Sequence, residues 1–173
     1  GGVAIVHVGG NTELEMQEKK DRVDDALHAT KAALEEGVVA GGGRALLYSL
    51  SVLPALENGN PDYNYGLKIV QQACKKPFEQ ILTNAGKTDT EAQILSYEFE
   101  DNKNPWSGYN IKTEKETDMK ESGIIDPLKV TRNALQNASS VAGTILLTEA
   151  VVVEKPDDKS SPEMDPSAMM GMM

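Results

Sequence analysis

Several kinds of residue are scarce in this chain of 173 residues, and each scarcity excludes a class of protein. The single cysteine, Cys74, excludes an internal disulfide framework, and its helical spacing from Val70 and Ala73 predicts a buried thiol. The 17 basic residues are outnumbered by 27 acidic ones and do not cluster, so we expect no nucleic-acid partner. No apolar run is long enough to cross a bilayer and no signal-like segment leads the chain, so we expect a soluble protein without a membrane partner.

The standard phosphate-binding motifs are also missing, since neither GxGxxG nor GxxxxGK[ST] occurs. Instead, Gly37 is placed to end a helix, and the glycine turn Gly41–Gly43 follows it before the next helical stretch. Glycines have no Cβ, so such a turn can bring bare backbone against a ligand. A tight connection between two packed helices is the more common use of a glycine cluster. From these residues alone, both interpretations stay open.

Hydrophobic periodicity and capping signals predict that most of the chain is helical. The pair Thr12 and Glu15 forms a capping box for the first helix. Pro77 is expected to kink or restart a later helix, because proline lacks the N–H that the helix needs. Asp126 is expected to cap the final helix, with Pro127 at its first position. The predicted helices cover about residues 12–36, 44–56, 62–84, 90–98 and 127–146.

Short strands are expected beside these helices. The pattern predicts strands at Val3–Val8 and Val151–Val153 and a small hairpin at Tyr109–Thr117. The stretch Glu98–Pro105 is charged and rich in asparagine, which indicates a surface loop. One face of the first helix is expected to be buried, because apolar residues recur along it at helical spacing. That face consists of Leu14, Val23, Ala26, Leu27, Thr30 and Leu34.

Several short motifs follow one another along the chain, namely Gly1–Ile5, Glu15–Lys20, Gly41–Gly43, Gly108–Asn110, Gly123–Pro127, Lys129–Arg132 and Ser140–Gly143. These motifs and their order resemble the group I chaperonin family, the GroEL-type ATP-driven folding machines. The resemblance extends from residue 1 to about residue 153, and Met169–Met173 ends the chain as family tails do. It implies a mainly α, multihelical chaperonin equatorial domain that is only partly present, with a few short β strands and a small hairpin.

Against the family, the chain corresponds to roughly the last third of a subunit. Residues 1–36 then form the C-terminal segment of the intermediate, or hinge, domain. Residues 37–153 form the C-terminal half of the equatorial ATP-binding domain, and residues 154–173 form a disordered tail containing Met and Gly. The chain opens at Gly1-Gly2 without an initiator Met and continues directly into an apolar run, so we interpret it as a fragment.

The resemblance implies that Asp25 is the catalytic residue. In the family, the hinge domain carries an aspartate and moves it toward the nucleotide when that domain closes. A carboxylate that positions the attacking water near the γ-phosphate acts almost entirely through placement and electrostatics. Without the resemblance, Asp21, Asp24 and Asp25 would more simply solvate an exposed helix face.

Six residues are implied to bind the nucleotide. Gly42, with Gly41 beside it, would pass close to the ribose and base. Asn110 would contact adenine, because its amide offers both a donor and an acceptor to a base edge. Ile111 and Lys112 occupy adenine-contacting positions too, although they replace residues that are small in much of the family. Asp126 would accept hydrogen bonds from the ribose hydroxyls, and its expected role as a helix N-cap is a competing explanation.

The resemblance also implies cofactors and partners. ATP, Mg²⁺ and K⁺ are expected, but the phosphate loop and the metal ligands belong to an N-terminal segment outside these residues, so no metal ligand is assigned here. The expected partners are identical subunits in a heptameric ring, single or double, a GroES-type co-chaperonin and unfolded polypeptides. The expected location is the cytoplasm, with an organelle matrix or phage-infected bacterial cytosol as other settings.

Two other functions stay open at this point. The chain could be a chaperonin-derived structural or assembly fragment without ATPase activity, or a helical binding domain that uses no nucleotide. The joint presence of Asp25, Gly42, Asn110 and Asp126 favours the ATP-driven chaperone, because a purely structural scaffold would not need all four. By itself, the fragment is expected neither to hydrolyse ATP nor to capture substrate.

Overall fold

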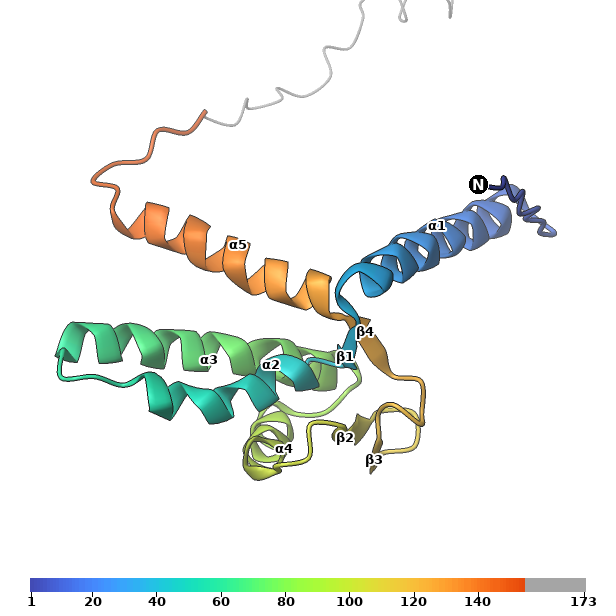
Figure 1. Ribbon diagram of the computed structural model, residues 1–173. Coiled ribbons are helices and arrows are strands. Elements are labelled where there is room, and N and C mark those ends of the chain that lie inside the picture. The colour runs from blue at the N-terminus through green and yellow to red at the C-terminus, as the bar shows by residue number, and fades with distance from the viewer. Residues whose placement is uncertain (155–173) are drawn as a thin grey trace, which may run out of the picture. The chain divides into compact units, whose positions relative to one another are not determined.

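The computed structural model describes residues 1–154 of the chain (Figure 1). The described residues are mostly helical with a few short strands, as the sequence predicts. The chain divides into two compact units between Ser139 and Ser140. The predicted tail from residue 154, including Met169–Met173, lies almost entirely outside the described residues. The elements are α1 (Glu13–Glu36), β1 (Val38–Ala40), α2 (Arg44–Ser49), the 3₁₀ helix η1 (Leu50–Leu56), α3 (Pro61–Asn84), α4 (Asp89–Asp101), β2 (Ser107–Asn110), β3 (Lys115–Asp118), β4 (Ile125–Pro127) and α5 (Leu128–Leu146).

The core lies where α2, η1, α3 and α4 pack together, and α2 and η1 run beside α3 (Figure 1). The aromatic rings of Phe78 and Phe99 meet there with their centroids 5.8 Å apart. Cys74 is buried, which confirms the sequence prediction, and burial raises the pKa of its thiol. The buried cluster consists of Leu47, Leu50, Cys74, Phe78, Leu82, Ala92 and Phe99.

Three predicted elements differ in detail from the observed ones. The helix expected over residues 44–56 tightens into a 3₁₀ helix at Leu50, four residues before Pro54. Helix α3 continues through Pro77 without a restart, and Phe78 on the next position is buried in the core. Helix α4 extends to Asp101, so the first half of the predicted loop at 98–105 is helical. Its buried residues Ala92, Ser96 and Phe99 share one face, and this packing holds the last turn.

The hairpin expected at residues 109–117 is confirmed as the antiparallel pair β2 and β3. A second pair was not predicted: β1 and β4 pair antiparallel, with Val39 opposite Asp126. Asp126 is therefore part of a strand, and α5 begins only at Leu128, so the expected N-cap role of Asp126 is wrong. The backbone N–H of Leu128 instead donates to Gly37 O at 3.1 Å.

Helix α1 begins as predicted but packs differently. The Thr12 hydroxyl accepts the Glu15 N–H, while the Glu15 carboxylate accepts the N–H of Asn11 rather than that of Thr12. None of its residues is buried, so the predicted buried face is wrong: Leu34, for example, is 83% exposed. An apolar stripe becomes buried only where another element covers it, and within residues 1–154 that face remains exposed.

The two outer strands are also absent. Residues 3–8 and 151–153 have no strand assignment, and Val3 is 96% exposed. A strand needs a neighbour to accept and donate its backbone hydrogen bonds, and neither segment has such a neighbour within residues 1–154. Among the described helices, none combines the length and apolar character needed to cross a membrane.

Candidate functional site

The glycine turn Gly41–Gly43 is fixed on both sides by main-chain contacts. The Gly41 N–H donates to Ile124 O at 3.0 Å, which ties the turn to the chain just before β4. Gly43 has φ +77°, and a Cβ at this position would lie 2.6 Å from Phe78 N. Only glycine allows this left-handed backbone to pack so closely on α3. The turn therefore serves the packing of α2 against α3, as the simpler interpretation of the glycine cluster proposed.

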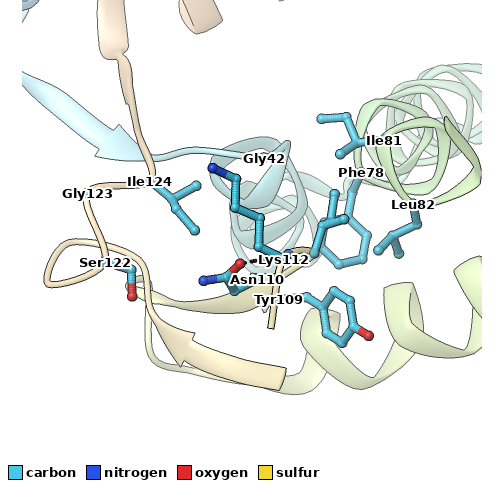
Figure 2. Close-up of a pocket in the computed structure, with 11 residues that line it drawn as sticks. Gly42, Phe78, Ile81, Leu82, Tyr109, Asn110, Lys112, Ser122, Gly123 and Ile124 are labelled. Carbon is cyan, nitrogen blue, oxygen red and sulfur yellow. Dashed lines mark hydrogen bonds between the residues drawn. The ribbon is translucent and has the colours of Figure 1, made fainter. Parts of the chain in front are cut away.

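The same turn also forms one wall of a cavity of about 380 Å³. Figure 2 shows Gly42 on one side of this cavity and the end of the β2–β3 hairpin on another. Phe78, Ile81 and Leu82 contribute an apolar wall from α3. The complete lining is Gly42, Phe78, Ile81, Leu82, Tyr109, Asn110, Ile111, Lys112, Ser122, Gly123 and Ile124.

Local packing explains how the hairpin presents its residues. A Cβ at Gly108 would lie 2.7 Å from the side chain of Met119, which is itself buried, so a larger residue here would displace that side chain. At the end of β2, the Asn110 Oδ1 accepts the Lys112 N–H at 3.0 Å and closes a local turn. The Nδ2 group of Asn110 is a hydrogen-bond donor at the edge of the cavity.

Asp126 lies close to this cavity but does not line it. It stands in β4, two residues after Ile124, and is partly buried. Burial raises the pKa of its carboxyl above the ordinary value. A second cavity, of about 270 Å³, contains Asp126 in its lining. The other lining residues are Ala26, Ala29, Thr30 and Ala33 of α1 with Val38, Ile125 and Pro127.

Asp25 is exposed on α1 and lines neither of these two cavities, although its neighbour Ala26 lines the second one. Helix α1 ends at Gly37, which has φ +84° and open space around it. The last turn of α1 is also tied to α5, because Glu35 pairs with Lys129 and Glu36 pairs with Arg132. These pairs are exposed, and exposed ion pairs contribute little stability.

The chain matches the model of the TCP-1/cpn60 chaperonin family over residues 1–156. This chain belongs to the TCP-1/cpn60 chaperonin family. It is also similar to the solved structure of a group III chaperonin in the open state, with 29% sequence identity and a TM-score of 0.69. That similarity covers 84% of this chain and 30% of the other, so this chain spans less than a third of that chaperonin.

Chaperonins are generally ATPases and form oligomeric rings. Of the residues predicted to bind nucleotide, the chaperonin fold brings Gly42, Asn110, Ile111 and Lys112 together around one cavity. Gly41, Asp126 and Asp25 do not line that cavity. Within residues 1–154, no group of three or more His, Cys, Asp or Glu side chains is placed to hold a metal ion.

Sequence reasoning missed several residues of the cavity. Tyr109 lies within the motif Gly108–Asn110, and Gly123 and Ile124 begin the motif Gly123–Pro127. Ser122 directly precedes that second motif, so the motifs could have indicated all four residues. Phe78 belongs to the apolar face of α3. Its local sequence does not show whether such a residue lines a cavity or packs inside the core. Arg44 does not line the cavity, and its position after the glycine turn was the only signal that it gave.

Proposed function

We propose that this chain is part of a group I-type, ATP-dependent chaperonin subunit that refolds non-native polypeptides. In that subunit it supplies the adenine and ribose side of the nucleotide site, together with the hydrolytic aspartate. One observation carries the proposal: the glycine turn and the hairpin end at Asn110, far apart in sequence, meet around one cavity with apolar walls and a polar edge.

The cavity suits a purine base. Its apolar residues Phe78, Ile81 and Leu82 favour the flat faces of a base over water, and Asn110 offers polar atoms to the base edge. Gly42 adds no side chain on its side, so backbone and ligand can approach closely. The volume of about 380 Å³ lies within the range of small-molecule sites.

Asp126 is proposed to bind the ribose hydroxyls. Its place in β4 removes the N-cap role that competed for its oxygens. A partly buried carboxylate with a raised pKa costs stability, and a functional role is one reason to retain it there. Its position two residues from Ile124 keeps it next to the wall of the base cavity.

Asp25 is proposed to act as the hydrolytic residue after α1 moves about Gly37. The helix buries no residue, and the joint at Gly37 has a backbone conformation that only glycine adopts readily. Such a joint can absorb a change in φ and ψ while the elements on either side stay intact. The carboxylate then contributes by orienting the attacking water.

The remaining parts are proposed to lie elsewhere in the subunit, because this chain spans only a fraction of the similar chaperonin. They are the phosphate loop, the ligands for Mg²⁺ and K⁺, and the surface that captures unfolded polypeptide and a GroES-type co-chaperonin. The proposed assembly is a heptameric ring, single or double, in the cytoplasm, an organelle matrix or phage-infected bacterial cytosol.

The test compares Asp25→Asn with Asp24→Asn in the full-length subunit. Both aspartates are exposed neighbours on α1, so the second variant controls for loss of charge on the helix. We expect Asp25→Asn to lower the rate of ATP hydrolysis by about 100-fold, the usual effect of losing one key electrostatic group. ATP affinity, measured by calorimetry, should change less than about twofold, because the residue acts on the transition state.

Equal hydrolysis rates in the two variants would remove the catalytic role of Asp25. If the full-length wild type binds no ATP, the nucleotide site itself is wrong. The alternative, a chaperonin-derived structural or assembly protein without ATPase activity, would then be preferred.

A further inference from the structure

Arg44 stands directly after the glycine turn and is completely buried, with 0% of its surface exposed. Burial lowers the pKa of its guanidinium below the ordinary range, because the charge is removed from water. No acidic side chain forms an ion pair with it among residues 1–154. A buried charge of this kind is costly, so its placement needs a reason.

The guanidinium donates to main-chain carbonyls of one segment, residues 102–107. Its Nε donates to Ser107 O at 2.6 Å, and its Nη2 donates to Asn102 O at 2.8 Å and to Asn104 O at 3.1 Å. Its central carbon, Cζ, also lies 5.3 Å from the centroid of the Tyr48 ring and 5.9 Å from the centroid of the Phe99 ring. The planar fork of arginine can satisfy several acceptors at fixed angles, which a lysine cannot.

These bonds join the two walls of the base cavity. Gly42 is two residues before Arg44, and Tyr109 is two residues after Ser107, the residue whose carbonyl accepts from Nε. The start of β2 is held further by Glu116 on β3, which accepts hydrogen bonds from Asn102 Nδ2 and from Ser107 Oγ. Arg44 therefore connects the glycine turn to a hairpin that has its own stabilising hydrogen bonds.

We propose that Arg44 is a positioning residue that sets the separation between the glycine turn and the β2–β3 hairpin, and so the fit of the purine base. It touches no nucleotide itself. This inference rests on the proposed function, because the cavity that it shapes is the proposed base site.

The experiment uses the full-length subunit and a matched control at a second buried cation. Lys75 is 5% exposed and pairs with Glu100, but it does not line the base cavity. Arg44→Met and Lys75→Met each replace a buried cation by an unbranched apolar side chain. Both variants should lower the free energy of unfolding, so stability does not distinguish a positioning residue from a merely structural one. The affinity for nucleotide does distinguish them.

Binding of ATP and of inorganic tripolyphosphate is measured by calorimetry well below the unfolding temperature. We expect Arg44→Met to weaken ATP binding by about tenfold, which is typical for a residue that acts on a site without touching the ligand. Tripolyphosphate has no base, so its affinity should stay within about twofold of wild type. Lys75→Met should leave both affinities unchanged, and Arg44→Lys should lose part of the ATP affinity because some of the three bonds remain.

Equal ATP affinities in Arg44→Met and Lys75→Met would overturn the positioning role. An equal loss for ATP and tripolyphosphate would also overturn it, because that result reports general disorder of the subunit. If Arg44→Met does not fold, Arg44→Lys gives the answer, and wild-type ATP affinity in that variant rejects the role. In all of these cases the wild type still binds ATP; its failure to do so would instead reject the proposed function, and this inference with it.

Discussion

Helix α1 and the glycine turn are separated by one short strand, yet they are supported very differently. Gly43 packs against the backbone of α3, and Arg44 is fully buried, whereas none of the 24 residues of α1 is buried. The base side of the proposed site is thus fixed by the packing of this chain. The helix that carries Asp25 is held mainly by its joint at Gly37, by two exposed ion pairs and by its contacts with β4. The proposed function requires this division, with a fixed base site and a helix that moves Asp25.

The sharpest way to break this comparison is to place a Cβ at two glycines that both have positive φ. We expect Gly43→Ala to lower the free energy of unfolding by about 4 kcal/mol or more, because backbone strain is added to a direct clash with Phe78. Gly37→Ala meets open space and should cost only about 1–3 kcal/mol, from strain alone. Denaturant unfolding measures both, and equal losses would show that the turn is no better packed than the joint.

A second pair of variants compares burial in the two regions. Leu47 in α2 is 0% exposed and Leu34 in α1 is 83% exposed. Leu47→Ala should lower the free energy of unfolding by about 2–5 kcal/mol, since it removes buried methyl groups and leaves a cavity. Leu34→Ala should change it by less than about 0.5 kcal/mol. A large loss in Leu34→Ala would mean that the apolar stripe of α1 is covered in the protein.

The smallest effect concerns Asp126. Burial raises its pKa in the folded chain, so the folded state holds the proton more tightly than the unfolded state does. The stability that this tighter proton binding provides is fully present at pH values below the pKa of Asp126 in the unfolded chain. It is lost as the pH rises through the pKa of Asp126 in the folded chain. At pH 7 the ionised carboxylate therefore opposes folding, and Asp126→Asn should raise the free energy of unfolding by less than about 1 kcal/mol.

The gain from Asp126→Asn should disappear near pH 3, where the unfolded carboxyl is protonated as well. Asp24→Asn on the exposed face of α1 is the control, and we expect no change in stability at either pH. A gain in Asp126→Asn that persists at low pH would show that desolvation of the charge is not its cause.

Local sequence signals predicted the elements whose cause lies within a few neighbouring residues. The Thr12 cap, the helix around Cys74 and the β2–β3 hairpin are confirmed, because capping, periodicity and turn formation act over short distances. The same signals predicted strands at residues 3–8 and 151–153 and a buried face on α1, and these predictions were wrong. Each of those features depends on a second segment that pairs with it or covers it.

The sequence by itself thus determined most helices, the hairpin, the buried thiol and the motifs that indicated a chaperonin. Tertiary structure alone decided that β1 pairs with β4, that Asp126 belongs to a strand, and that Arg44 holds the hairpin beside the glycine turn. It also decided that Phe78 lines the cavity with Gly42 and Asn110. The physical reason is distance along the chain: a cap is satisfied by residues three positions away, whereas a strand pair, a buried guanidinium and a cavity wall need segments that only the folded chain brings together.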